Sequence, residues 1–293
     1  MVRNDTMASR FFDVFNVVFL VSYALATVVP FIYIIGTSFA TQAEMASRPF
    51  FLIPRSFQLE SYKYILSSRT LPRAMGVSVW TTLLGTFISM LLTLTFAYPL
   101  SKKYLIGRNP LLMMVTFTLV FSGGMIPTFL NVRNLGLLDS YWALILPGAI
   151  GTWSLIVVKN FFQALPLELE ESAKIDGASD LTVFIKIVMP ISTAVIATFS
   201  LFYAVGYWNA FRPALLYLPS RPDRWPLPLI LRNIVMLTAG RIDDANFDPS
   251  LVLPPTESVR NAVIVFATVP ILLVYPFLQK HFTKGVMIGA IKG

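Results

Sequence analysis

Six long apolar stretches constrain this chain more than any other feature of its sequence. A helix needs about 20 predominantly apolar residues to cross the hydrocarbon core of a bilayer. Open strands would leave backbone groups unpaired in lipid. The sequence therefore predicts an all-helical integral membrane protein with six spans: Val14–Phe39, Ala74–Leu100, Leu111–Leu130, Tyr141–Val158, Pro190–Phe211 and Ala262–Leu278. We expect residues 1–293 to form a single transmembrane domain.

The low share of charged residues excludes an ordinary soluble enzyme. Charged residues make up 13% of the 293 residues, whereas soluble domains carry about 25%. The net charge of +8 is interpreted as cationic loops beside anionic lipid headgroups, and we expect no nucleic-acid partner. The chain has no cysteine and one histidine, His281, so we expect no catalytic residue and no metal site.

All fifteen acidic residues fall outside the six apolar stretches. A proton-driven carrier usually needs a carboxylate or histidine relay inside the membrane, so the energy for transport is expected to come from another source. Orientation follows from the basic residues of the short loops. Loop 101–109 has three basic residues and loop 131–140 has Arg133 alone, which favours cytoplasmic N- and C-termini.

A polar segment covers residues 160–189, between the fourth and fifth spans. Pro166 suits the first position of a helix, and the acidic residues that follow complement the helix dipole. Glu170 and Lys174 have the i, i+4 spacing of a favourable ion pair, and Gly177 suits a left-handed helix stop. These features predict a short acidic helix, a glycine turn and a second helix that leads into the fifth span.

The same segment contains a spaced pattern: Glu171-Ser172-Ala173, three residues, Gly177, nine residues, and Ile187-Val188-Met189-Pro190. Without this pattern, an ordinary surface helix between two spans would be the simpler interpretation. The pattern resembles the EAA motif of bacterial ABC importer permeases, with Ser172 in place of the second-position alanine and Met189 in place of leucine. The resemblance implies the type I ABC importer permease fold, in which this segment is a cytoplasmic coupling helix docked on a separate ATPase.

The resemblance also implies which residues couple the chain to the ATPase. Leu165, Leu169 and Ala173 recur four apart, so they would form an apolar face that fills the docking cleft. The predicted coupling set is Leu165, Leu169, Glu170, Glu171, Ser172, Ala173, Asp176, Gly177, Ile187 and Pro190. The chain has no GxxxxGK[ST] phosphate loop, so we expect it to bind no cofactor, with ATP and Mg on the partner ATPase.

The whole chain resembles a narrower group, the second permease subunit of carbohydrate importers of the maltose type. The first span, the long loop 217–259 and the basic tail carry this likeness. The ending, residues 279–293, looks like the subgroup that imports oligosaccharides and polysaccharide fragments, and the strongest likeness is to the second permease of the alginate importer. The resemblance implies a multi-pass protein of the bacterial inner membrane. Its partners would be a second permease chain in a heterodimer, two ATP-binding subunits, and a periplasmic or surface-tethered solute-binding protein that delivers the carbohydrate.

Two outer loops and a group of aromatic residues leave alternatives open. Loop 40–73 has five basic residues and two acidic ones, which favours an acidic sugar polymer or an acidic partner, although such loops also lie near anionic lipid. Loop 217–259 is either a solvated connection or a contact with the binding protein. Six further residues either anchor helices at the membrane interface or line the substrate path: Tyr203, Tyr207, Trp208, Asn209, Asn131 and Trp153.

Other classes of function remain as alternatives. A secondary carrier would transport its solute without ATP, using an ion gradient. An ABC permease for amino acids, phosphate or metals would share the EAA pattern. An intramembrane enzyme finds no support, because the sequence has no HExxH, no GxSxG and no pair of intramembrane aspartates.

Overall fold

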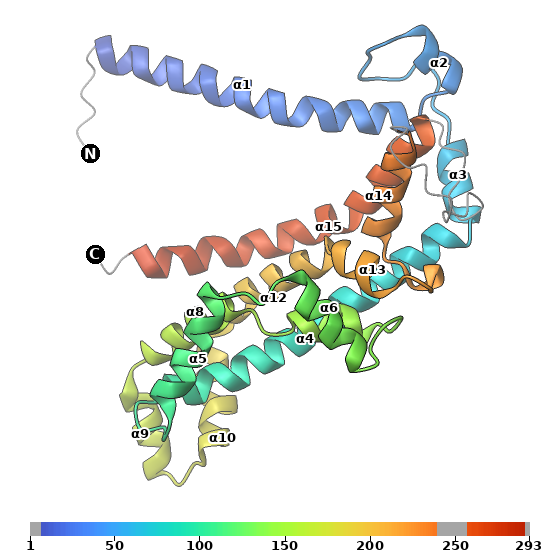
Figure 1. Cartoon of the computed structure of the whole chain (residues 1–293). Helices are drawn as coiled ribbons and strands as arrows, with labels where there is room; N and C mark the ends of the chain where they lie inside the picture. The colour runs from blue at the N-terminus through green and yellow to red at the C-terminus, as the bar shows by residue number, and fades with distance from the viewer. Residues whose placement is uncertain (1–6, 239–256, 291–293) are drawn as a thin grey trace. The chain divides into compact units, whose positions relative to one another are not determined.

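The computed structural model describes the backbone of residues 7–238 and 257–290 and the side chains of residues 7, 9–236 and 257–274. Every regular element in these ranges is helical (Figure 1). The elements are α1 (Met7–Ser38), α2 (Gln42–Ser47), α3 (Glu60–Ser67), α4 (Thr70–Ser101), α5 (Arg108–Val120), α6 (Met125–Asn134), α7 (Trp142–Ile145), a 3₁₀ turn (Leu146–Gly148), α8 (Thr152–Gln163), α9 (Leu167–Ile175), α10 (Asp180–Val183), a π-helical turn (Phe184–Val188), α11 (Met189–Ile191), α12 (Thr193–Trp208), α13 (Arg212–Tyr217), a 3₁₀ turn (Pro222–Arg224), α14 (Leu227–Thr238) and α15 (Glu257–Ala290).

Three helices are long and apolar enough to cross a membrane: α1, α4 and α15. Three further pairs meet the same test jointly but are bent, by 118° between α5 and α6, by 52° between α7 and α8, and by 82° between α11 and α12. The described residues therefore contain three candidate spans, or six if each bent pair is one span. The six spans predicted from the sequence correspond to the upper value.

The bends lie at residues that interrupt a helix. Gly124, between α5 and α6, has a φ of +86°, a conformation that favours glycine. Pro147 lies in the 3₁₀ turn between α7 and α8, and Pro190 lies just before the bend at Ser192. Proline has no amide hydrogen to donate, and neighbouring helices can compensate for such breaks in a membrane. The prolines and glycines of the sequence thus account for the broken helices.

The chain divides into two compact units, and the first comprises residues 1–72 and 233–269. Buried polar contacts join its parts. The Asn261 side-chain amide donates to Thr37 Oγ1 at 2.9 Å, and Ser258 Oγ donates to the Ala40 carbonyl at 3.0 Å. Ser38 Oγ and Tyr62 Oη are 2.8 Å apart. These bonds attach the end of α1 both to the start of α15 and to α3 within this unit.

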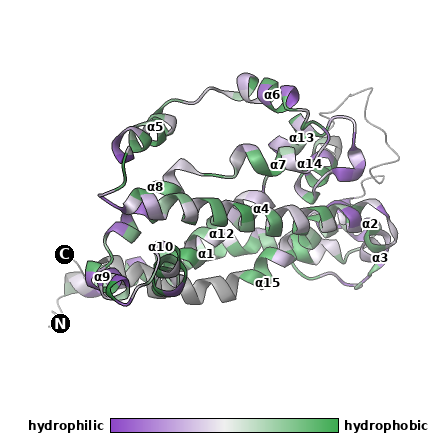
Figure 2. Cartoon of the chain, turned by 90° about the horizontal axis from the view of Figure 1, so that it is seen from below, coloured by the Kyte–Doolittle hydropathy of each residue, from purple (hydrophilic) through white to green (hydrophobic). Residues whose placement is uncertain are grey.

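The second unit comprises residues 73–232 and 270–293. Its main core joins α4, α8, the π-helical turn and α12 through buried apolar side chains such as Leu94, Val158, Val188 and Phe199. The polar segment around α9 continues from α8 at one end of this unit (Figure 1). Figure 2 shows hydrophilic residues along α9, in contrast to the largely hydrophobic α12.

Some of the sequence expectations concern residues outside the described ranges. Part of the predicted outer loop 217–259 is among them, from residue 239 to residue 256, as are the side chains of the basic tail and of His281. The backbone of α15 is described to Ala290, beyond the predicted end of the sixth span. Likewise α1 begins at Met7, before the predicted first span, because apolar stretches mark the membrane crossing and a helix can extend past it.

Candidate functional site

The predicted coupling segment forms a helix, a glycine turn and a second helix. Gly177 has a φ of +81°, its N–H donates to the Lys174 carbonyl at 3.0 Å, and the Ala178 N–H donates to the Ala173 carbonyl at 2.9 Å. This pair of bonds is a Schellman motif, in which a left-handed residue ends the helix. The prediction of a left-handed glycine stop is therefore confirmed.

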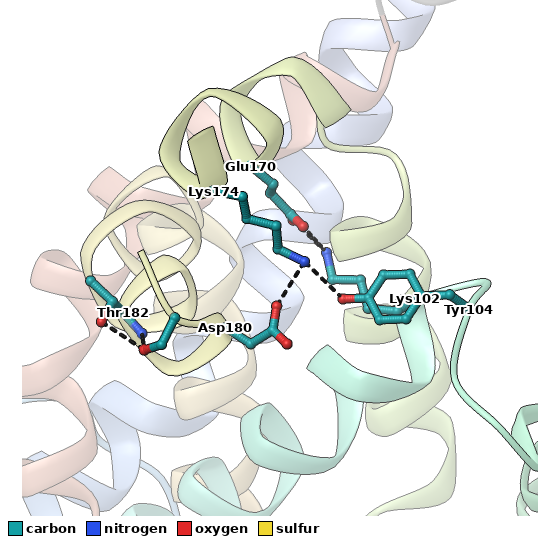
Figure 3. Close-up of polar contacts among 7 residues, drawn as sticks. Lys102, Tyr104, Glu170, Lys174, Asp180 and Thr182 are labelled. Carbon is teal, nitrogen blue, oxygen red and sulfur yellow. Dashed lines mark hydrogen bonds and ion pairs between the residues drawn. The ribbon is translucent and has the colours of Figure 1, made fainter. Parts of the chain in front are cut away.

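The second helix of the segment has a cap that sequence reasoning missed. Ser179 Oγ accepts from the Thr182 N–H at 3.3 Å and lies 2.9 Å from Thr182 Oγ1 (Figure 3). A serine followed by a helix-compatible aspartate is a usual start signal, so this cap could have been found. At the other end of the segment, Pro166 is the N-cap of α9, one residue before the helical position predicted for it.

The predicted ion pair between Glu170 and Lys174 does not form, and Glu170 pairs with Lys102 instead. The Lys102 ammonium donates to both carboxylate oxygens of Glu170 (Figure 3). Lys102 follows the end of α4, so this contact joins two segments that are 68 residues apart. Both side chains are buried, with 7% of each residue exposed. Glu170 pairs with Lys102 and not with the exposed Lys174, because a buried charge needs a counter-charge that is buried with it.

Lys174 has two other partners. Its ammonium forms an ion pair with Asp180 at 2.8 Å and donates to Tyr104 Oη at 3.4 Å, as Figure 3 shows. The Asp180 carboxylate and then the Tyr104 hydroxyl raise the pKa of Lys174 above its ordinary value. Both side chains are partly exposed to solvent, 40% for Lys174 and 60% for Asp180, so this ion pair between α9 and the start of α10 contributes little to stability.

The residues of the predicted apolar docking face of α9 do not all face the same way. Leu165 and Ala173 pack against the core of the second unit, whereas Leu169 is 42% exposed. The side chains that face outward follow the helical spacing of three and four and include Ile175, which is 86% exposed. Sequence reasoning did not select Ile175. The outward face consists of Glu168, Glu171, Ser172 and Ile175.

The other members of the predicted coupling set lie at the ends of the two helices. Asp176 is the exposed C-cap of α9. Ile187 packs against the core of the second unit, in the π-helical turn. Pro190 lies at the start of α11. These residues shape the segment and its entry into α12 but do not join the outward face of α9.

Two of the six predicted substrate-path residues share a cavity. Tyr203 and Tyr207, on α12, line a cavity of about 320 Å³ together with Tyr217 and residues of the α7–α8 connection. Their hydroxyls are hydrogen-bonded to α4, since Tyr203 Oη is 2.8 Å from Thr93 Oγ1 and Tyr207 Oη is 2.9 Å from Ser89 Oγ. The two tyrosines therefore line the cavity, while their hydroxyls hold α12 against α4.

The two hydroxyls also reach the connection between α7 and α8. Tyr203 Oη accepts from the Gly151 N–H at 3.0 Å, and Tyr207 Oη donates to the Ile145 carbonyl at 3.2 Å. This bridging position stabilises backbone groups that the break between α7 and α8 leaves without helical partners. Each tyrosine thus joins three segments of the second unit.

The other four predicted path residues lie elsewhere. Trp208 is buried and lines a separate apolar cavity of about 260 Å³. Trp153 is 54% exposed and packs against Phe199 and Phe202. The Asn209 side chain is exposed and donates to the Val205 carbonyl at 3.0 Å, and Asn131 is exposed on α6. Among the described residues, no group of three or more acidic or histidine side chains could hold a metal ion.

These observations define the class of protein. Long and broken membrane helices, with an acidic helix–glycine turn–helix between two of them, are the features of an ABC importer permease. A crystal structure agrees: that of a bacterial ABC transporter involved in the import of the acidic polysaccharide alginate has a TM-score of 0.86, is 30% identical, and the match covers 94% of this chain and 98% of that chain.

Comparison of sequences gives the family. The Protein LplC of Bacillus subtilis is 53% identical over 290 residues, which are 99% of this chain and 98% of that protein. The polygalacturonan/rhamnogalacturonan transport system permease protein YtcP of the same organism is 53% identical over 98% of this chain and all of its own length. No family model matches. The chain belongs to the permease family of carbohydrate ABC importers.

Membership of this family fixes the general role of the chain. It is a multi-pass membrane permease of a bacterial, binding-protein-dependent carbohydrate importer. The chain is a transport subunit and has no ATPase site of its own, and a partner ATPase handles ATP. An ATPase and a binding protein are therefore its partners.

Proposed function

We propose that this permease spans the inner membrane six times with cytoplasmic termini, and that α9 is its coupling helix. It would pair with a second permease chain in a heterodimer and be served by two ATP-binding subunits. The observation that supports this most directly is the outward face of α9. Glu171 and Ile175 are exposed next to a glycine turn, while the opposite side of the helix is fixed to its own chain.

The outward face of α9 combines charge with an apolar side chain. Glu171 is available for a charge-assisted contact to a basic group on the ATPase. Ile175, one helical turn further on, supplies the apolar anchor of a helix-in-groove contact. Glu170 belongs to the other side of the helix, because it is buried against Lys102. We therefore assign docking to Glu171, Ser172 and Ile175, and anchoring to Glu170.

Co-purification tests the docking face. The complete importer is purified from membranes through a tag on this chain, and the amount of bound ATPase is measured. Glu171→Lys is expected to release most of the ATPase while the chain stays in the membrane. Glu60→Lys, the same charge reversal at an exposed residue of α3, is the matched control and should have no effect. Normal ATPase binding by Glu171→Lys would contradict the assignment of α9.

We further propose that the imported solute is an acidic oligosaccharide or polysaccharide. One relative is a permease of a polygalacturonan/rhamnogalacturonan transport system, and the matched solved structure concerns import of the acidic polysaccharide alginate. Polygalacturonan is likewise a polymer of an acidic sugar. The first unit of this chain exposes three cations, Arg55, Lys63 and Arg69, for which the described residues provide no ion pair.

The stimulation of ATP hydrolysis tests the substrate class. The purified importer and its binding protein are incubated with galacturonate oligomers, with alginate oligomers, or with neutral maltose oligomers of the same length. Acidic oligomers are expected to stimulate hydrolysis and neutral ones are not. Stimulation by the neutral oligomers alone would refute the acidic class while leaving the role of the chain as a carbohydrate permease intact.

A further inference from the structure

The turn between α4 and α5 holds the coupling segment at two points. Lys102, at the start of this turn, pairs with Glu170 of α9. Tyr104, two residues later, accepts a hydrogen bond from Lys174 of the same helix at 3.4 Å. Figure 3 shows both contacts on the same side of α9. This side is opposite to the face that we assign to the ATPase.

The contact between Lys102 and Glu170 is tightly enclosed. Both residues are 7% exposed, and the Lys102 ammonium lies 4.5 Å from the centroid of the Tyr98 ring on α4. An ion pair in such a place resists separation, because parting it would leave two buried charges without partners. The pair is therefore a stiff connection between α9 and the end of α4.

The same end of α4 is also joined to α8. Arg108 Nε donates to the Leu100 carbonyl at 2.9 Å, and Arg108 Nη2 donates to Gln163 Oε1 at 3.2 Å. The ends of α4 and α8 and the start of α5 are thus held together beside the coupling helix. A displacement of α9 therefore acts on this group of helix ends as well as on α10, to which Lys174 is paired.

From Lys102, α4 leads to the two tyrosines of the cavity. The helix runs from Thr70 to Ser101 as one element, with Pro99 in its last turn, and its Ser89 and Thr93 hold the hydroxyls of Tyr207 and Tyr203. The alternative route through α10 and α11 crosses the 82° bend at Ser192. A continuous helix transmits displacement more directly than a bent one, since contiguous packed elements carry coupling between sites.

We infer that Lys102 is a positioning residue of the transport cycle: through Glu170 it passes the movement of the coupling helix to α4, and α4 passes it to the cavity of Tyr203 and Tyr207. This inference rests on the proposed role of α9 as the coupling helix. Because Lys102 is buried, we assign it to act through Glu170 and not through a contact of its own with the ATPase or the sugar. Its function is to make the cavity respond when nucleotide binds to the partner.

The test uses the absence of cysteine from the natural sequence. A single cysteine, Ala210→Cys, is placed in the lining of the cavity, and its rate of reaction with a maleimide is measured on the complete importer. The rate is compared without nucleotide and with ATP plus orthovanadate. In the otherwise unchanged chain, the two rates are expected to differ by at least about fivefold, the lower end of typical coupling between sites.

The decisive variant removes the ion pair without leaving a buried charge. Lys102→Met combined with Glu170→Met should fold, because apolar replacement of both partners of a buried pair is usually tolerated. We expect it to retain bound ATPase and its hydrolysis but to bring the ratio of the two labelling rates close to one. The reversed pair, Lys102→Glu with Glu170→Lys, should recover the response. Lys103→Met is the matched control, since Lys103 is exposed and adjacent, and it should respond normally.

Each other outcome has a defined meaning. A normal nucleotide response in the Met/Met variant overturns the inference. Loss of bound ATPase from that variant also overturns it, because Glu170 would then be a docking contact. If the Met/Met variant fails to accumulate in the membrane, the reversed pair decides, and its failure to respond overturns the inference. Failure of the proposed coupling role itself looks different, since the unchanged importer would then show no nucleotide response and Glu171→Lys would bind ATPase normally.

Discussion

Gly85 of α4 lies directly against the ring of Tyr207 on α12. A Cβ atom built at position 85 would lie 2.8 Å from two carbons of that ring, which is closer than side-chain carbons approach one another in proteins. Four and eight residues further along α4 are Ser89 and Thr93, which hydrogen-bond to Tyr207 and Tyr203. One face of α4 therefore receives both tyrosines, and the close approach at Gly85 makes this packing possible.

Gly85→Ala is expected to push α12 away from α4. The added methyl group cannot be accommodated without moving the Tyr207 ring, and overpacking of this kind costs about 1–3 kcal/mol. The gain in helix propensity offsets only about 1 kcal/mol of this cost. We therefore expect the Gly85→Ala variant to unfold at a lower temperature than the unchanged chain, measured on the purified chain in mild detergent.

The control for this prediction lies on the same helix. A Cβ atom at Gly76 would have no neighbour within 4 Å, so Gly76→Ala should leave the unfolding temperature unchanged or raise it slightly. If the two substitutions have equal effects, the contact between Gly85 and Tyr207 contributes nothing to stability.

Tyr203→Phe is expected to destabilise the second unit through an unpaired amide. The change removes the acceptor for the Gly151 N–H and the partner of Thr93 Oγ1, and a buried polar group without a partner costs about 1–3 kcal/mol. Thr93→Val added to Tyr203→Phe should cost little more, because both groups belong to the same hydrogen-bond network. Thermal unfolding of the two single variants and the double variant measures this coupling, and strictly additive losses would contradict it.

The glycine stop of the coupling segment was predictable from the sequence, but the partner of Glu170 was not. A left-handed glycine after a helix depends on local geometry alone, and Gly177 adopts it. The pairing of Glu170 depends on which distant segment meets α9. An exposed i, i+4 pair contributes only about 0.2–0.5 kcal/mol, so the buried Lys102 prevails over Lys174. Nothing in the spacing of residues indicates that the loop after α4 folds back onto α9.

The positions of the helix bends could likewise be predicted from local sequence, whereas the direction in which a helix faces could not. Gly124, Pro147 and Pro190 mark the positions at which the helices bend, because these residues limit backbone hydrogen bonding or favour unusual backbone angles. The direction in which α9 faces could not be predicted. Leu165 and Ala173 have the spacing of an exposed docking face, but the core of the second unit covers both and leaves Ile175 outward.

Glu44 is expected to make the first unit sensitive to acid. Its Oε1 accepts from the Arg55 N–H at 2.9 Å and from Arg48 Nη1 at 2.8 Å. The Arg55 N–H and then the Arg48 guanidinium lower the pKa of Glu44 below its ordinary value of 4.5, against the opposing effect of burial. A carboxyl with a lowered folded-state pKa stabilises the protein above its unfolded pKa, and this stabilisation is lost as the pH falls through the folded value.

The comparison of the unchanged chain with Glu44→Gln as a function of pH measures this effect. The unchanged chain should unfold at the higher temperature near pH 7, and its advantage should shrink as the pH is lowered from about 5 to about 3. Glu60→Gln is the control, because Glu60 is exposed and has no ion pair among the described residues. An advantage that grows toward low pH would contradict the assigned hydrogen bonds.

Substitutions at Gly177 can distinguish two roles of this glycine: formation of the turn after α9 and close approach of the ATPase. Its φ of +81° strains any residue with a Cβ atom, at a cost of roughly 1–2 kcal/mol, while a Cβ atom there would meet nothing of this chain within 4 Å. Asparagine tolerates this backbone conformation better than alanine does. Gly177→Asn should therefore preserve the thermal stability that Gly177→Ala partly loses. If the ATPase approaches the backbone at this turn, both variants should release ATPase in co-purification, regardless of their stability. If only Gly177→Ala releases it, the glycine serves the turn alone, and docking depends on Glu171 and Ile175.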